Sequence, residues 1–149
     1  MPTDPLSNAG RELLKVILQK PEVIKSWNQL HPKAFTYPPY AAIANEISLR
    51  SKTVNISELI SALEEPVQIV ARQLLVEPIA ADESALELYG QSIFARVQEL
   101  ALTGEIATVK SELSRVNPES DFESYNQLFS QLMALEAKRR EALALIMGS

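Results

Sequence analysis

The sequence contains no cysteine, a single histidine and only four glycines in 149 residues. Without cysteine there is no disulfide framework, no thiol nucleophile and no zinc–thiolate site. Glycine-rich phosphate loops and nucleophile elbows are also missing. Few stretches alternate apolar and polar residues as a half-buried strand does. These absences argue against most enzyme chemistry and against a β-sheet fold.

The chain also lacks an excess of positive charge, a long apolar run and a signal-like start. Its net charge is −5, whereas a nucleic-acid surface needs clustered Lys and Arg. No apolar run approaches the roughly 20 residues of a membrane span, and residues 1–5 lack the charged and apolar regions of a signal peptide. We therefore expect a soluble, cytoplasmic protein that contacts no membrane, and nucleic acid only indirectly.

The residues that could carry chemistry have structural explanations. His31 has no companion ligand and lies in a proline-rich loop, where we expect a surface residue. The acidic pairs Glu64–Glu65 and Asp82–Glu83 stand at expected helix ends, where carboxylates are solvated or favoured by the helix dipole. No glutamate–histidine pairing suits a carboxylate metal site. We expect no catalytic residue, no metal and no cofactor in this chain.

The apolar fraction of 46% supports a real core, and its periodicity is helical. The expected fold class is all-α: a helical bundle joined through a long helix to a C-terminal antiparallel helical hairpin. We expect residues 1–6 to be a linker or tail, residues 7–102 the bundle, and residues 103–149 the hairpin. The long helix, residues 83–116, belongs to both parts.

The long helix is the central prediction. Asp82 is a suitable N-cap, and Asn117-Pro118 ends the helix because the residue before a proline is pushed out of helical geometry. The apolar stripe changes face near Gly104, which predicts two successive packing partners. A single helix wrapped on both sides, or two helices with a kink at Gly104, are the alternatives. The first stripe is Leu86, Tyr89, Ile93, Val97 and Leu100, and the second is Leu102, Ile106, Val109, Leu113 and Val116.

Capping and proline signals predict the other helix starts. Ser7 or Asn8 is expected to cap the first helix. Asn55–Glu58 and Ser120–Glu123 have the spacing of a capping box. Proline is favoured in the first turn of a helix, which predicts helix starts at Pro21, Pro38 and Pro66.

The last helix, which runs almost to Met147, carries more apolar surface than a two-helix hairpin needs. Phe129 and Met133 lie beside the stripe that suits its hairpin partner. Either another protein covers this wider band, since monomers rarely leave such patches exposed, or the hairpin folds back onto the bundle and buries it. Lys138-Arg139-Arg140 could form the charged rim of an interface. The inner stripe is Tyr125, Leu128, Leu132 and Leu135.

Three stretches carry a resemblance to a known family. Arg11-Glu-Leu-Leu-Lys-Val-Ile-Leu-Gln-Lys-Pro-Glu22, Lys33-Ala-Phe-Thr-Tyr-Pro-Pro-Tyr-Ala-Ala-Ile43 and Leu135-Glu-Ala-Lys-Arg-Arg140 resemble the C-terminal domain of bacterial DNA primase, most closely that of actinobacterial primases. The resemblance covers nearly the whole chain and rests on apolar patterns rather than catalytic signatures. It implies a non-catalytic fragment, because the zinc-binding and polymerase domains of a primase are absent.

The resemblance also implies a protein-interaction domain. It would dock on the N-terminal domains of the replicative DNA helicase, mainly through the hairpin of about residues 103–147, and couple primer synthesis to the replication fork. In some family members the bundle also receives the acidic C-terminal tail of single-stranded-DNA-binding protein, and the counterpart residues are Arg11 and Lys15. The helicase-binding residues implied here are Leu128, Phe129, Leu132, Met133, Lys138, Arg139, Arg140, Leu143 and Ile146.

Two other functions stay open. The N-terminal domain of a replicative helicase shares this fold, and it predicts a homo-oligomer formed through the hairpin. A helical domain that binds single-stranded DNA would use Lys138, Arg139 and Arg140, and its binding would be sensitive to salt.

Overall fold

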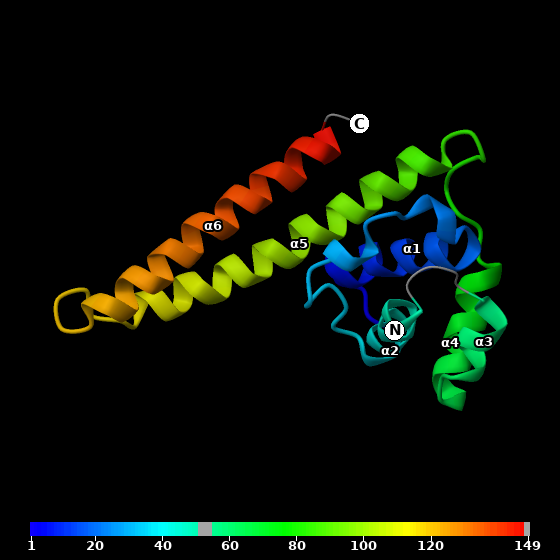
Figure 1. The fold of residues 1–149 in the computed structure, drawn as a ribbon, viewed down its shortest axis with the longest axis horizontal. Helices are drawn as coiled ribbons and strands as arrows, with labels where there is room; N and C mark the ends of the chain where they lie inside the picture. Colours follow the sequence, from blue (N-terminus) through cyan, green and yellow to red (C-terminus); the bar gives the residue numbers. More distant parts are fainter. Residues whose placement is uncertain (51–54, 148–149) are drawn as a thin grey trace.

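The computed structural model of this chain describes residues 1–50 and 55–147, and within them every regular element is helical. The all-α prediction is therefore confirmed. Figure 1 shows a bundle of short helices from which a long antiparallel hairpin projects. The elements in chain order are α1 (Pro5–Gln19), η1 (Pro21–Val23), η2 (Trp27–Gln29), α2 (Pro38–Leu49), α3 (Ile56–Ser61), α4 (Glu65–Val76), α5 (Leu86–Ser114) and α6 (Phe122–Met147).

Helix α1 is the centre of the bundle. It packs against α2, α4, α5 and η1, and nearly every side chain of its middle turns is buried. A helix that is apolar on most sides must be covered by several neighbours. The main core cluster is Leu14, Ile17, Leu18, Tyr40, Ile43, Ala44, Ile47, Leu59, Ile60, Leu63, Ala71 and Leu74.

The first helix begins earlier than predicted. Asp4 is its N-cap, and the Asp4 carboxylate accepts a hydrogen bond of 3.1 Å from the Ser7 amide. Pro5 occupies the first turn, where its missing N–H is no loss. The prediction of a tail over residues 1–6 is therefore wrong from Asp4 onward, and Ser7 is a buried helical residue instead of a cap.

Most of the other predicted helix starts are confirmed. Proline stands in the first turn of η1, α2 and α4, and the Asn55 side chain accepts from the Glu58 amide at 3.2 Å to cap α3. At the tip of the hairpin the expected Ser120–Glu123 box is replaced by another contact. The Asn117 side chain accepts hydrogen bonds from the Glu119 and Ser120 amides at 2.9 and 3.4 Å. A side chain of the turn thus satisfies two free backbone amides of the same turn before α6 begins.

The long helix α5 is shorter than predicted at both ends, since it begins at Leu86 and ends at Ser114. Asp82 does act as a cap, but of a turn that precedes the helix. Its carboxylate accepts from the Ala85 amide at 2.9 Å and from the Ser84 hydroxyl at 2.7 Å. A short acidic side chain can satisfy the amides of a turn as well as those of a helix start.

Helix α5 is continuous through Gly104 and has two successive partners. Its N-terminal half packs on α1 and η1, and its C-terminal half packs on α6 (Figure 1). The change of face in the apolar stripe correctly predicted this arrangement, and the kinked alternative is wrong. The hairpin has its own core, made by Leu102, Ile106, Val109, Leu132 and Leu135.

Candidate functional site

The inner side of α6 closes the hairpin. Leu132 and Leu135 are buried against α5, and Leu128 packs partly buried beside them. Three residues of the stripe expected to face the hairpin partner are therefore part of the hairpin core, whereas its fourth residue, Tyr125, is half-buried and stacks on Phe129. Leu128 and Leu132 were expected to bind a partner. They face α5 instead and contribute to the exposed side of α6 only by packing the helix onto α5.

The outer side of α6 bears an exposed apolar band, defined here as Phe122, Phe129 and Met133. Their exposed fractions are 64%, 45% and 47%. The Tyr125 and Phe129 rings stack with centroids 6.4 Å apart, which fixes the orientation of the Phe129 ring. The band lies on the projecting hairpin and is not buried by the bundle. Of the two interpretations left open by the sequence, the structure favours an exposed surface.

The three consecutive cations of α6 point in different directions. Lys138 and Arg140 are exposed, whereas Arg139 turns toward α5. Its Nε donates to the Thr103 hydroxyl at 3.0 Å, and its Nη2 lies 3.4 Å from Oε1 of the buried Glu99. Lys138 and Arg140 are therefore available to a partner, while Arg139 is already engaged within the hairpin.

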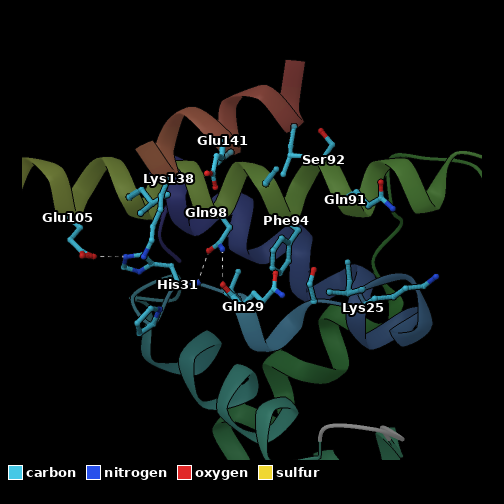
Figure 2. Close-up of a pocket in the computed structure, with 18 of the residues that line it drawn as sticks. Lys25, Gln29, His31, Gln91, Ser92, Phe94, Gln98, Glu105, Lys138 and Glu141 are labelled. Carbon is cyan, nitrogen blue, oxygen red and sulfur yellow. Dashed lines mark hydrogen bonds and ion pairs between the residues drawn. The ribbon is translucent and has the colours of Figure 1, made fainter. Parts of the chain in front are cut away.

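A cavity of about 790 Å³ lies on the other flank of α6. Figure 2 shows it between the last turns of α6, the middle of α5 and the segment of residues 23–32. Leu145 lines this cavity and is 67% exposed, while Leu143 and Ile146 are half-buried. The C-terminal turns of α6 thus carry apolar surface on more than one side.

His31 is part of the cavity wall and not a surface residue, contrary to the prediction. Its side chain is only 8% exposed, and Nε2 lies 2.8 Å from Oε1 of Glu105. Nδ1 accepts from the Lys33 amide at 3.0 Å, which puts the proton of the neutral ring on Nε2. Gln98 accepts from the His31 amide and donates to the Gln29 carbonyl, at 2.6 and 2.9 Å (Figure 2). These bonds fasten the loop to α5.

The two cations expected to receive an acidic tail are also engaged. Arg11 donates to the Tyr40 hydroxyl at 2.8 Å and pairs with Glu77. Burial opposes the charged form of Arg11, but the Tyr40 contact and the Glu77 charge outweigh it and raise the pKa of Arg11. Lys15 is buried and donates to the Pro78 carbonyl at 3.0 Å. Both cations hold the chain after α4 against α1.

Nothing in the described ranges, 1–50 and 55–147, groups three His, Asp or Glu side chains in a way that could hold a metal ion. Among those residues no helix combines the length and hydropathy needed to cross a membrane. The candidate functional surfaces are therefore the apolar band and the cavity.

Comparison with known proteins identifies the family. Residues 10–128 match the family described as "DNA primase DnaG DnaB-binding". The chain belongs to this family. It is 32% identical to the DNA primase of Mycobacterium leprae and 34% identical to that of Mycobacterium tuberculosis H37Rv, over 95% of this chain and 24% of each relative. The chain therefore spans about a quarter of the length of these relatives.

The fold also matches a solved structure, the helicase-binding domain of primase from Mycobacterium tuberculosis. The TM-score is 0.71 with 31% sequence identity, covering 95% of this chain and 94% of that one. The resemblance to an actinobacterial primase domain is confirmed, and the family is that of a non-catalytic primase domain. The family match favours primase over the alternative of a helicase N-terminal domain.

Sequence reasoning missed Glu99 and Thr103 as residues that hold the hairpin together. The available signal was an acidic residue within the apolar run from Val97 to Leu102, because an acid in such a run is buried only when it is paired. The identity of its partner could not be inferred, since Arg139 lies 40 positions further along the chain.

Proposed function

We propose that this chain docks on the N-terminal domains of a bacterial replicative helicase and so couples primer synthesis to the replication fork. The observation that carries the proposal is the exposed apolar band on a hairpin that projects from the bundle. Family membership supports it, because the matched family is described by its binding to DnaB. The parent protein would be a DNA primase that works in the cytoplasm.

The chemistry of the band suits a protein partner. Phe129 and Met133 offer a large aromatic and an adaptable thioether to a complementary pocket, and such groups dominate interface energetics. Arg140 is exposed on the same side of α6 as the band and provides a polar contact at its rim. Lys138 is exposed on the opposite flank, beside the cavity, and is contacted only by a partner that also extends over that flank. Leu143 and Ile146 extend the proposed surface toward the C-terminus. Leu128 and Leu132 contribute by keeping α6 packed on α5.

The test is calorimetric titration of the chain into the replicative helicase of the same organism. Phe129→Ala combined with Met133→Ala is expected to raise Kd at least about tenfold, since each truncation removes a partly exposed anchor. Leu88→Ala is the matched control, because Leu88 is an exposed leucine at the bundle end of α5. Unchanged affinity of the folded double variant would overturn the site, and no binding by the unmodified chain would overturn the function.

We also propose that the chain acts as two units that share α5, residues 7–102 and residues 103–149. Separate cores support this division, one around α1 and one between α5 and α6. Native-state hydrogen exchange is the measurement: amides of α6 should open at a lower free energy than amides of α1. A single opening free energy shared by α1 and α6 would contradict the division.

A second proposed partner is the acidic C-terminal tail of single-stranded-DNA-binding protein, received by Arg11 and Lys15. Both cations lie on α1 and share Glu77, so a carboxylate of the tail would have to take the place of Glu77. Titration of the tail peptide against the chain and against Arg11→Ala tests this. Equal binding by the two proteins, or no binding by either, would remove the assignment.

Direct binding of single-stranded DNA has less support. Arg139 is paired with Glu99, so only Lys138 and Arg140 of these three cations are exposed. The chain as a whole carries a net charge of −5. Contact with nucleic acid is therefore proposed to be indirect, through the partner proteins. A salt-sensitive mobility shift with single-stranded DNA would contradict this.

A further inference from the structure

A seam of six residues runs along one side of α6. Its members follow one another at alternating steps of four and three residues, so they lie within about 80° of one another around the helix. Such steps are typical of the contact line along which two helices of a coiled coil pack. The seam, defined by these six positions, is Phe122, Asn126, Phe129, Met133, Glu136 and Arg140.

The seam is not the side of α6 that closes the hairpin. Leu132 and Leu135, which are buried against α5, stand about 80–140° around the helix from the middle of the seam. Five of the six seam side chains are exposed, and the sixth, Glu136, is half-buried beside Lys110. Because the hairpin projects from the bundle (Figure 1), another helix can approach the seam along its length.

The seam is symmetric about residue 131. When two identical helices pack antiparallel around a two-fold axis, positions equally far before and after the centre face each other, and each contact occurs twice. The facing pairs are Phe122 with Arg140, Asn126 with Glu136, and Phe129 with Met133, which stand nine, five and two positions from residue 131.

The two inner pairs are chemically complementary. Phe129 of one copy meets Met133 of the other, and contacts between a thioether and an aromatic ring are favourable. The Asn126 amide can donate to the Glu136 carboxylate of the other copy, which is a hydrogen bond to a charged acceptor. The Tyr125 ring already orients the Phe129 ring by stacking on it, so less side-chain freedom is lost on pairing.

The outer pair is complementary as well. Arg140 of one copy faces the Phe122 ring of the other, where a guanidinium gains a cation–π contact. Glu119 and Asp121, both exposed, lie beside Phe122 at the tip of the hairpin and add negative charge opposite Arg140. Parallel packing would instead put Arg140 against Arg140 and Glu136 against Glu136, and such like-charge contacts are unfavourable. The seam therefore favours the antiparallel arrangement.

We propose that a second copy of this chain binds along the seam, as an antiparallel pair of α6 helices with two-fold symmetry. The seam spans only about 27 Å, so the pair buries less than the roughly 800 Å² per partner of a standard interface. The pair is therefore weak, with a Kd on the order of 100 µM.

Pairing also regulates the docking surface proposed above. Phe129, Met133 and Arg140 belong both to that surface and to the seam, so a second copy and the helicase compete for the same side of α6. This competition rests on the proposed function, whereas the pairing itself does not.

Sedimentation equilibrium at chain concentrations from well below to well above this Kd tests the pairing. Asn126→Glu puts a carboxylate opposite Glu136 of the second copy and should raise the Kd of the pair at least about tenfold. Gln131→Glu is the matched control, because it makes the same change of charge at an exposed position about 180° around α6 from the seam. A chain that stays monomeric throughout, or an equal effect of the two variants, would overturn the proposal.

The absence of cysteine makes the orientation of the pair measurable. A spin label is attached to one introduced cysteine at a time, by Ser130→Cys or Ala144→Cys, both at exposed positions of α6. In the antiparallel pair the two labels are offset along the helix axes by about 3 Å for the first variant and about 39 Å for the second. Pulsed electron resonance should therefore give a short distance for Ser130→Cys and a long one for Ala144→Cys. Equally short distances in both variants would show a parallel pair and refute the arrangement.

Addition of the replicative helicase of the same organism tests the competition. The short distance of the Ser130→Cys pair should disappear as the chain binds the helicase. If this distance persists in the helicase-bound chain, the seam is not shared and the regulatory role is wrong. If the unmodified chain does not bind the helicase, the proposed function fails, while sedimentation and the label distances still decide the pairing.

Discussion

Two glycines of α5 lie in opposite surroundings, and they allow a paired test of how this helix packs. A Cβ built at Gly104 meets no atom within 4 Å, and the residue is exposed in the helix interior. Alanine is a better helix former than glycine by about 1 kcal/mol. Gly104→Ala should therefore stabilise the chain by up to about 1 kcal/mol, because nothing opposes the gain in helix propensity.

Gly90 should respond in the opposite direction. A Cβ there would lie 2.7 Å from Cγ1 of Val23, 3.2 Å from Cδ1 of Ile24 and 3.4 Å from Cγ1 of Val16. Val23 and its η1 turn would have to move away from α5. Overpacking of this kind costs about 1–3 kcal/mol, which exceeds the gain in helix propensity of about 1 kcal/mol. The expected net effect of Gly90→Ala is a loss of up to about 2 kcal/mol.

Urea and thermal denaturation of the two variants and the unmodified chain, followed by circular dichroism, measure both effects. A change of 1 kcal/mol corresponds to about 2–4 °C in Tm for a domain of this size. Fluorescence of Trp27 reports the bundle separately, since its ring packs on Phe35. A lower Tm for Gly104→Ala would refute the view that the glycine is free of packing constraints. A higher Tm for Gly90→Ala would refute the close packing of α5 on η1.

Three further changes test the packing and caps by the same denaturation assay. Leu132→Ala removes a buried leucine from the hairpin core and should cost about 2–5 kcal/mol; a loss below 1 kcal/mol would contradict its burial. Hydrogen bonds from Ser7 lower the pKa of Asp4, the side chain having the larger effect and the backbone amide the smaller one. The ionised Asp4 cap therefore stabilises α1 above pH 4 or so, and this stabilisation is lost as the pH falls further. Asp4→Ala should therefore destabilise the chain at pH 7 and flatten the acid limb of its stability profile; an unchanged limb would exclude the cap. Tyr40→Phe removes the hydroxyl that accepts from Arg11 and should cost about 1 kcal/mol, whereas an unchanged midpoint would show that the bond contributes nothing.

Helix existence was predictable because the signals are local. Prolines in the first turns and the Asn55 cap act within four residues, and the structure contains them as expected. The two capping errors have different causes. At Asp82, an aspartate satisfies free amides equally well at a helix start and in a turn, so the sequence does not distinguish the two. At the first helix, Asp4, Ser7 and Asn8 are all residue types that cap helices, and the prediction chose the later two although Asp4 is the cap.

The candidate site was predictable only in part, because side-chain direction depends on distant residues. The spacing of Phe129 and Met133 beside the inner stripe predicted an apolar band, and the structure leaves both exposed. Three adjacent cations look alike in a sequence, yet Arg139 differs from its neighbours because Glu99 and Thr103 lie opposite it. His31 similarly becomes buried through Glu105, 74 positions away.

The geometry of α6 also decides which surface a docked helicase would leave open. At 3.6 residues per turn, Lys138 and Leu145 stand about 120–180° around the helix from Phe129 and Met133. They line the cavity, whereas the apolar band faces the other flank. Arg139 lies between these two flanks and faces α5, where it meets Glu99. A partner seated on the band alone therefore contacts α6 without covering the cavity, whereas a partner that also contacts Lys138 would extend over the cavity.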